Sequence, residues 1–172
     1  DPNVSNFFRF FRDNFHRLGL RKLIASCFRE VDNNSSQIQN DERAFCCEYN
    51  GTEPMLVAPF RGNGDFRSEE CIELLKRSDI VVTNPPFSLF REFVSQIVKY
   101  NKQFLIIGNV NAITYKEIFD LIQNNKAWLG VNLGRGISGF IVPKDYKQYG
   151  SEVHVNEVGQ TIIATNGCLW LT

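Results

Sequence analysis

The sequence predicts an α/β fold in which a mostly parallel sheet has helices on both faces and an antiparallel edge. Helical and strand patterns alternate along the chain, which is the order of βαβ units. Two near-continuous apolar runs, "DIVVT" (79–83) and "QFLIIGNV" (103–110), are typical of strands buried on both faces. The final segments "EVHVNEV" and "QTIIATNGCLWLT" indicate a hairpin turned near Gly159, which would supply the antiparallel edge.

The chain is expected to begin with an amphipathic helix. In "NVSNFFRFFRDNFHRLG" (3–19), apolar side chains recur every three or four residues and Gly19 closes the pattern. The apolar positions are Val4, Phe7, Phe8, Phe11, Phe15 and Leu18. The segment "LRKLIASCF" (20–28) follows as a short strand. The polar, aperiodic residues 31–43 are predicted to be a mobile loop.

A hairpin and a helix are predicted next. Residues 44–60, "AFCCEYNGTEPMLVAPF", contain Asn50-Gly51, which supplies the positive φ angles of a hairpin turn. Ser68 then caps a helix over 68–78, with Glu69 and Glu70 in its first turn.

The second half alternates regularly. Helices are predicted over "SLFREFVSQIVKY" (88–100) and "YKEIFDLIQNN" (115–125), separated by the apolar strand at 103–110. Further strands are expected at "AWLGV" (127–131) and "GFIVP" (139–143). There is no internal repeat, and residues 1–172 are predicted to form a single domain.

Composition excludes several classes of protein. The formal net charge is zero, so nothing indicates a strong non-specific nucleic-acid binder. Five cysteines without a Cys-x-x-Cys pair, and two histidines far from them, predict reduced thiols and no metal site. No apolar run has the length of a membrane span and no signal peptide is visible, so a cytoplasmic location is expected. No pattern indicates an oligomeric state.

The stretch "DIVVTNPPFSLF" (79–90) carries the functional signal. Ligands of open α/β sheets bind beyond the carboxyl ends of the strands, and Asn84-Pro85-Pro86-Phe87 directly follows such a strand. The Asn84 amide oxygen and the Pro85 carbonyl, held by rigid prolines, suit the two hydrogens of an exocyclic amine. The Phe87 ring offers a face on which a base stacks. Such acceptors aim the nitrogen lone pair at an electrophile without any side-chain nucleophile.

Asn-Pro-Pro-Phe matches the catalytic motif of S-adenosylmethionine-dependent amino-methyltransferases. The wider context, "GDFRSEECIELLKRSDIVVTNPPFSLFREFV" and "FLIIGNVNAITYKEIF", resembles the EcoRI-type adenine-specific DNA methyltransferases, as does "SNFFRFFRDNFHRLGLRKLIAS". The resemblance covers most of residues 1–130 and is weaker beyond. It implies a Rossmann-like methyltransferase fold, a bacterial or phage origin and a role in restriction–modification. The implied partner is double-stranded DNA, whose target adenine must be flipped out of the helix.

The resemblance assigns further residues. Asn84, Pro85 and Pro86 would form the target-amine pocket, and Phe87 would stack on the flipped base. On the cofactor side, Asp65 would end the strand before the motif strand and contact the adenine of S-adenosylmethionine. Phe66 would pack on that adenine, and Ser26 and Cys27 would lie near the ribose. No acidic residue of the usual ribose-binding kind stands there.

The sequence departs from the general methyltransferase pattern at its start. The glycine-rich loop that usually follows the first strand is absent, and "DPNVSNFF" begins where that strand should have ended. In the EcoRI-type family an aspartate-proline loop stands in this place, which makes Asp1 the remaining cofactor-loop residue. The missing strand would lie centrally, between "LIAS" and "DIVVT". The natural protein is therefore expected to extend upstream.

Several alternatives remain open. The motif also serves methyltransferases that act on an amine in RNA or on a protein glutamine. A non-catalytic, nucleic-acid-binding remnant of the fold is a further possibility. The element that recognises the DNA sequence would lie beyond Thr172, on a partner subunit, or in residues 31–60. Arg61, Arg67 and Arg91 flank the motif edge and are candidate phosphate contacts, although exposed arginines are common.

Overall fold

The computed structural model contains two compact units, Asp1–Asp79 and Ile80–Thr172, which we call unit 1 and unit 2 and describe separately. The residues that the structure describes are 2–30, 43–130, 137–143, 146, 153–165 and 167–172. Asp1, residues 31–42 of the predicted loop and residues 131–136 lie outside them.

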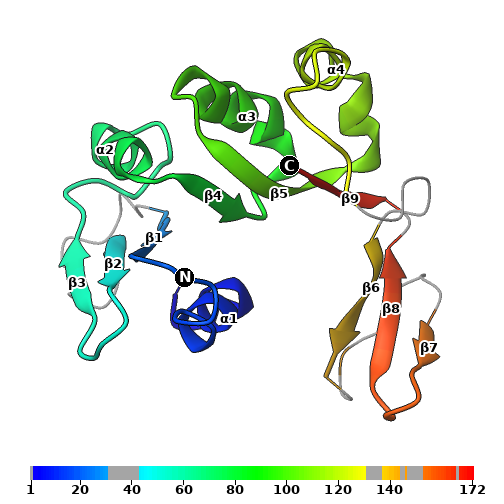
Figure 1. Ribbon diagram of the computed structural model, residues 1–172, viewed down its shortest axis with the longest axis horizontal. Helices are drawn as coiled ribbons and strands as arrows, with labels where there is room; N and C mark the ends of the chain where they lie inside the picture. The colour runs from blue at the N-terminus through cyan, green and yellow to red at the C-terminus, as the bar shows by residue number, and fades with distance from the viewer. Residues whose placement is uncertain (1, 31–42, 131–136, 144–145, 147–152, 166) are drawn as a thin grey trace. The chain divides into compact units, whose positions relative to one another are not determined.

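Unit 1 is built on a three-stranded antiparallel sheet (Figure 1). Its strands, in the spatial order β1-β2-β3, are β1 (Leu23–Cys27), β2 (Phe45–Tyr49) and β3 (Leu56–Pro59). The helices are α1 (Asn6–Asp13) and α2 (Glu69–Arg77). The predicted hairpin is confirmed as β2 and β3. The connection from Asn50 to Met55 is longer than a tight turn, with Gly51 at a φ of 100°.

Helix α1 is shorter than its apolar pattern predicted. The Ser5 side chain caps it by accepting a hydrogen bond from the Phe8 amide, and the helix ends at Asp13. The chain continues in turns, so the predicted face is divided: Phe8 and Phe15 are buried, whereas Val4 and Leu18 are exposed.

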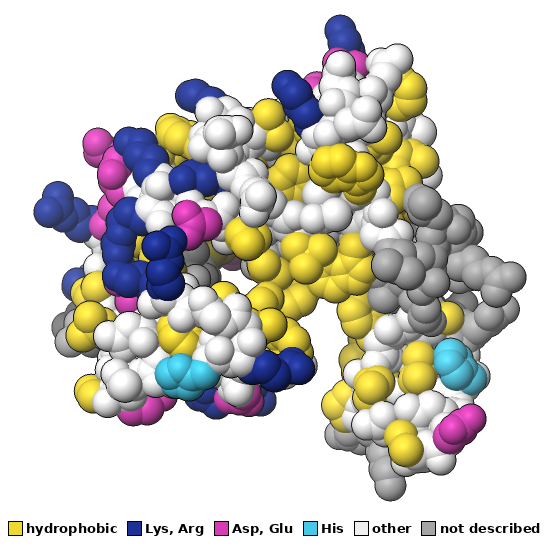
Figure 2. Space-filling view, viewed as in Figure 1, with side chains coloured by type: hydrophobic (Ala, Val, Ile, Leu, Met, Phe, Trp, Pro, Cys, Tyr) yellow, Lys and Arg dark blue, Asp and Glu magenta, His cyan; other side chains and the backbone are white. Residues whose placement is uncertain are grey.

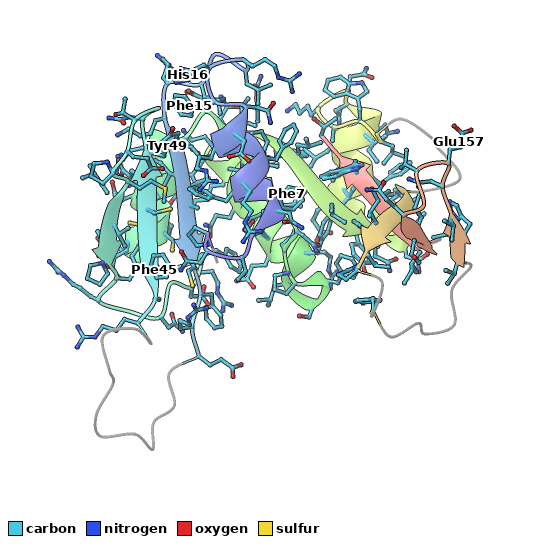
Figure 3. All side chains as sticks on the ribbon, turned by 90° about the horizontal axis from the view of Figure 1, so that it is seen from below. Phe7, Phe15, His16, Phe45, Tyr49 and Glu157 are labelled. Carbon is cyan, nitrogen blue, oxygen red and sulfur yellow. The ribbon has the colours of Figure 1, made fainter. Side chains whose placement is uncertain are left out.

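A contact between aromatic rings joins the turns after α1 to the hairpin. The centroid of the Phe15 ring lies 5.1 Å from that of Tyr49 at the end of β2, with an edge-to-face angle of 78° (Figure 3). This contact fastens the first segment of the chain to the sheet of unit 1.

Helix α2 forms as predicted. The Ser68 hydroxyl caps it by accepting from the Cys71 amide, and the acidic pair Glu69 and Glu70 occupies the first turn. Below the helix, a small core holds Ala44, Cys46, Phe60 and Cys71. All five cysteines are free thiols, and burial raises the pKa of the Cys46, Cys47 and Cys71 thiols, which keeps them protonated.

Unit 2 contains the strand that leads into the Asn-Pro-Pro-Phe motif. Strand β4 (Ile80–Thr83) pairs in parallel with β5 (Gln103–Asn109), and β9 (Cys168–Leu171) pairs antiparallel with β5 on its other side. The connecting elements are η2 (Phe87–Leu89), α3 (Phe90–Lys99), η3 (Val110–Thr114) and α4 (Lys116–Gln123). This β4–α3–β5 crossover is the predicted βαβ unit. An antiparallel strand lies beside it as expected, but it is β9 alone and not the predicted terminal hairpin.

The main core of unit 2 lies where α3 and α4 pack on this sheet. Phe90, Val94 and Ile97 of α3, three or four residues apart, are each 1% exposed, as the predicted apolar face requires. They join Ile106 of β5 and Ile118 of α4 in one cluster. The helices therefore hold the carboxyl end of β5 and the start of α3 against each other.

A second sheet of unit 2 is entirely antiparallel, in the spatial order β6-β8-β7. It comprises β6 (Ile137–Val142), β7 (Val153–Val155) and β8 (Thr161–Thr165). The turn near Gly159, with a φ of 78°, confirms the predicted hairpin. The expected single strand at 160–172 is divided between β8 and β9, which belong to different sheets. The predicted strand at 127–131 is reduced to one bridge, Leu129 to Leu171.

The described residues thus form a mixed α/β structure with three small sheets and four α-helices. The expectation of a mostly parallel sheet is not met in them, because β4 and β5 are the only parallel pair among the described strands. A parallel partner was expected for strand β1. Instead, β1 pairs antiparallel with β2, the first strand of the hairpin that follows it in sequence. Helices on both faces of the sheet are not shown either, because α3 and α4 both pack on the β4–β5–β9 sheet in the same core cluster. The prediction of a single domain stays a prediction.

Candidate functional site

The Asn-Pro-Pro-Phe segment lies where the sequence predicted, at the carboxyl end of a parallel strand pair. Thr83, the last residue of β4, is in register with Ile106 of β5, and β5 continues for three residues to Asn109. Residues that follow β4 and residues that end β5 therefore reach the same edge of the sheet. Asn84 and Phe87 are exposed there, whereas Pro85 is buried.

The backbone of this segment is stiff and leaves acceptors available. Pro86 opens the short helix η2, and its carbonyl accepts a hydrogen bond from the Leu89 amide at 3.0 Å. Among the described residues, none donates to the Pro85 carbonyl or to the Asn84 side chain. The Phe87 ring is 44% exposed. An amide oxygen, a free carbonyl and an open ring face thus stand on four consecutive residues.

A cavity of about 200 Å³ lies beside Phe87. Its lining residues come from the segment after β4, and from the last residue of β5 and the segment after it. They are Phe87, Phe90, Asn109, Asn111, Ala112 and Tyr115. Gly108 allows the first of these segments to approach the second, because a β-carbon at Gly108 would lie 2.6 Å from Cζ of Phe90. The cavity is smaller than the roughly 300–1,000 Å³ of pockets that enclose drug-sized ligands, and its size suits a single planar base.

Polar residues line this cavity, and a cation contacts one of its lining residues. The Asn109 side-chain oxygen accepts a hydrogen bond from the Asn111 amide at 2.8 Å, which fixes the Asn109 side chain at the start of η3. The guanidinium of Arg91 lies 5.1 Å from the centroid of the Tyr115 ring, at cation–π distance. Arg91, a predicted phosphate contact, therefore stands next to the cavity and keeps its positive charge exposed.

Four of the five residues predicted for the cofactor lie in unit 1 near the carboxyl end of β1, namely Ser26, Cys27, Asp65 and Phe66, and the fifth, Asp1, lies outside the described residues. The Arg29 amide donates to the Asn63 carbonyl at 2.9 Å, which draws the loop after β3 against that end. Gly64 makes the approach possible: its φ is 75°, and a β-carbon would overlap the Cys27 carbonyl oxygen. Ser26 is exposed and the Cys27 side chain is buried, so only the backbone of Cys27 can face a ligand.

Asp65 is not at the end of a strand, contrary to the expectation. It lies in the loop between β3 and α2, six residues after Pro59, because the chain uses β3 for the antiparallel hairpin. The loop nevertheless brings Asp65 close to the end of β1 through Asn63 and Gly64. Asp65 therefore lies near the end of β1, but a loop and not the end of a strand places it there.

Arg67 contacts both residues that were predicted to bind the cofactor adenine, Asp65 and Phe66. Its backbone amide and Nε donate to Oδ1 of Asp65 at 2.8 Å, and Nη2 donates to Oδ2 at 2.6 Å. These hydrogen bonds lower the pKa of Asp65 below its ordinary value. The same guanidinium lies 5.2 Å from the centroid of the Phe66 ring. The Asp65 carboxylate is still 24% exposed, so a carboxylate and an aromatic ring remain accessible side by side, which fits an adenine ring with its amine.

Five of the six residues that line the unit 2 cavity were not predicted as site residues: Phe90, Asn109, Asn111, Ala112 and Tyr115. A signal for Asn109 was present, because it ends the strand that follows the motif strand in a βαβ unit. No sequence signal places Asn111 or Tyr115, since both depend on the path of η3. Arg67 was named for phosphate, and the structure pairs it with Asp65 instead.

Other candidate sites are less developed. A larger cavity in unit 1, of about 370 Å³, lies between α1 and the hairpin and includes none of the predicted site residues. Figure 2 shows Lys and Arg side chains gathered around α2 and the hairpin with acidic side chains among them, so this surface has no single sign of charge.

Within the described residues, no group of His, Cys, Asp or Glu is arranged to hold a metal ion. The described helices are all too short or too polar to cross a membrane.

Comparison with known proteins settles the family. The sequence model of the family described as "Adenine-specific methyltransferase EcoRI" matches residues 1–172. The chain belongs to this family. The EcoRI-type relatives include the type II methyltransferase M.EcoRI of Escherichia coli, which is 57% identical over 179 aligned positions. Two others are M.MgeORF184P of Mycoplasma genitalium, 42% identical over 149, and M.MpnI of Mycoplasma pneumoniae, 39% identical over 174.

The alignments cover all of this chain for M.EcoRI and M.MpnI and 87% of it for M.MgeORF184P. They cover 55%, 51% and 43% of those relatives respectively, so the chain spans about half the length of these EcoRI-type proteins. No solved structure matches the chain.

Proposed function

We propose that this chain is the catalytic part of an enzyme that transfers a methyl group from S-adenosylmethionine to the N6 amine of adenine in DNA. The observation that carries the proposal is the Asn84–Phe87 segment at the carboxyl end of β4, with Asn84 and Phe87 exposed and a base-sized cavity beside Phe87. The family supports the same reaction, because its description names adenine-specific methyltransferases. We extend this to a restriction–modification role inside a bacterial cell, as the type II names of the relatives suggest.

In the proposed mechanism, the target adenine leaves the duplex and enters the cavity of unit 2. Unstacking costs on the order of a few kcal/mol, which the Phe87 ring offsets by stacking on the base. The Asn84 amide oxygen and the Pro85 carbonyl accept the two N6 hydrogens. Because Pro85 and Pro86 fix the backbone, these acceptors are in place before the base arrives. The nitrogen lone pair is thereby directed out of the ring plane.

When bound, the cofactor would supply the electrophile, a methyl group on a positively charged sulfur; the carbon–sulfur bond would break as the nitrogen–carbon bond forms, a neutral thioether would leave, and the amine would lose one N6 hydrogen as a proton to solvent. Asp65 and Phe66 would hold its adenine, and Ser26 and the Cys27 backbone would lie at its ribose. Arg67 orients the Asp65 carboxylate through three hydrogen bonds, so the acceptor is preorganised. The contribution of Asp1 is part of the same proposal, although Asp1 lies outside the described residues.

We further propose that the strands belong to a Rossmann-like methyltransferase sheet. In the described residues, β1 and β4 are each an outer strand of their own three-stranded sheet. Each therefore has one edge at which another strand can pair. The β4–β5–β9 arrangement, with its antiparallel strand beside the parallel pair, is compatible with such a sheet.

Methyl transfer by the full-length natural protein tests the proposal. Labelled S-adenosylmethionine is offered with duplex DNA, RNA or a glutamine-containing protein, and the product is digested and identified. We expect N6-methyladenine in DNA. The Asn84→Ala variant should lose transfer by about 100-fold or more, because one preorganised acceptor of the amine is gone. The matched control is Gln123→Ala, an exposed amide at the end of α4.

Each alternative has its own outcome. Label in RNA or in protein, with none in DNA, would assign the same pocket to another amine. Absence of transfer to every substrate, together with retained DNA binding, would favour a non-catalytic remnant. Full activity of Asn84→Ala on DNA would refute the role given to Asn84.

A further inference from the structure

The cavity beside Phe87 has hydrogen-bonding groups that the described part of the chain leaves unused. The Asn109 side chain uses its oxygen for the Asn111 amide. No described residue hydrogen-bonds to Nδ2 of Asn109 or to the Tyr115 hydroxyl. Asn109 and Tyr115 both line a cavity whose other lining residues are Phe87, Phe90, Asn111 and Ala112. A ligand of this cavity would be flat, largely apolar on its faces and polar at its edge.

The hydrogen bond within η3 determines what Asn109 can offer. Only the oxygen of its amide group can accept the N–H of Asn111, so the nitrogen occupies the other position. The hydrogen-bonding group of the Asn109 amide that is left over is therefore a donor and not an acceptor. Its backbone is equally constrained, since Asn109 pairs with Cys168 of β9 at the end of β5. The donor thus stands on a strand, which holds it more precisely than a loop would.

A donor at this place matches adenine in particular. The ring nitrogens N1, N3 and N7 of adenine are acceptors. Guanine shares the acceptors N3 and N7 but carries a hydrogen at N1, so a donor that faces N1 distinguishes the two bases. Enzymes that act on flipped bases read them by hydrogen bonds to that edge and by stacking. The Asn84 and Pro85 acceptors take the amine hydrogens, and a nearby donor completes a pattern that adenine satisfies.

We propose that Asn109 is a specificity-determining residue, whose Nδ2 donates a hydrogen bond to a ring nitrogen of the flipped adenine. The inference rests on the adenine methyl transfer proposed above. Asn109 does not take part in the transfer itself: it fixes the rotation of the base in its plane, and so places the amine between Asn84 and Pro85. A base without an acceptor at that position covers this donor without pairing it and binds in the cavity less well.

The test combines one variant with altered bases. Asn109→Asp keeps an oxygen for the Asn111 amide and replaces the donor by a second acceptor. DNA duplexes carry adenine, 1-deazaadenine, 3-deazaadenine or 7-deazaadenine at the target position, and kcat/KM is measured on the full-length natural protein. Asn101→Asp, an exposed site in the same unit after α3, is the control for the added charge.

We expect the wild-type protein to lose roughly 5- to 100-fold in kcat/KM on one of the three deaza bases, the cost of one unpaired donor. Asn109→Asp should be slower on adenine by a similar factor and show no further loss on that same base. Asn101→Asp should behave as wild type. A purely structural role of Asn109 predicts instead equal losses on all four duplexes.

Two other outcomes overturn the proposal in distinguishable ways. Wild-type activity that is unchanged on all three deaza bases refutes the hydrogen bond from Asn109, even when the variant fails to fold, and leaves the proposed function standing. Failure of the wild-type protein to methylate adenine in DNA refutes both the function and the inference.

Discussion

The ring of Phe90 lies directly against Gly108, so that a β-carbon on Gly108 would be 2.6 Å from Cζ and 2.8 Å from Cε2 of that ring. Phe90 opens α3 and Gly108 lies near the end of β5. This contact brings together the two segments that form the base-sized cavity. The packing of two residues therefore determines the shape of the proposed base pocket.

Replacing Gly108 by Ala should destabilise the protein by about 1–3 kcal/mol, because the added methyl group overpacks a ring that is 1% exposed. Thermal unfolding measures the change. Gly62→Ala is the control, since the nearest atom to its β-carbon would be 3.7 Å away. The double variant Gly108→Ala/Phe90→Leu should recover part of the loss. Equal melting temperatures for Gly108→Ala and wild type would contradict the contact.

Replacing Phe87 by Ala should weaken binding of DNA with a flipped target base by roughly 1–3 kcal/mol, the contribution of one base stacked on an aromatic ring. Stability should change little, because the Phe87 ring is 44% exposed. Phe119→Ala on α4 is a matched control, with a ring that is 53% exposed outside the cavity. Titration of fluorescent DNA measures both affinities. If the two variants bind alike, Phe87 does not stack on the base.

Replacing Gly64 by Ala should displace the Asn63–Asp65 loop from the end of β1 and weaken S-adenosylmethionine binding. A left-handed φ alone costs about 1–2 kcal/mol for a residue with a β-carbon. Gly64 carries an additional overlap with the Cys27 carbonyl. Gly19→Ala separates the two costs, because Gly19 has a φ of 64° and nothing within 4 Å of its β-carbon. Calorimetry should show weaker cofactor binding for Gly64→Ala alone.

Glu48 should make the stability of unit 1 depend on pH. Hydrogen bonds from Lys22, and then from Arg77, hold the pKa of Glu48 below its ordinary value. A lowered folded pKa contributes stability above the unfolded value of about 4.3, and that contribution disappears as the pH falls through the lower folded pKa. Glu48→Gln should therefore cost about 1 kcal/mol at pH 7 and nothing in strong acid.

Denaturant unfolding at several pH values checks this difference. Glu73→Gln is the control, because Glu73 makes an exposed ion pair with Lys76 within α2 and such pairs contribute little. A Glu48→Gln variant whose stability differs from wild type equally at every pH would show that packing, and not charge, explains the loss.

The elements with strong local signals were predictable from the sequence. Ser68 and the acidic residues after it mark the start of α2, and the spacing of Phe90, Val94 and Ile97 marks the buried face of α3. Asn50-Gly51 and Gly159 mark two hairpins, because few other residues adopt a positive φ. Local preference was less reliable at α1, where the apolar pattern continues to Leu18 but the helix ends at Asp13.

By itself, the sequence determined which chemical groups the Asn84–Phe87 segment offers, that this segment follows an apolar strand, and which family the chain resembles. All three can be read from residues that are consecutive in the chain. Only the tertiary structure decided that β1 pairs with a hairpin, that Arg67 holds Asp65, and that Asn109 and Tyr115 line one cavity with Phe87. Each of these depends on which distant segments meet. Strand pairing and side-chain packing are contacts between such segments, and they are selected by the free energy of the whole fold and not by local preference.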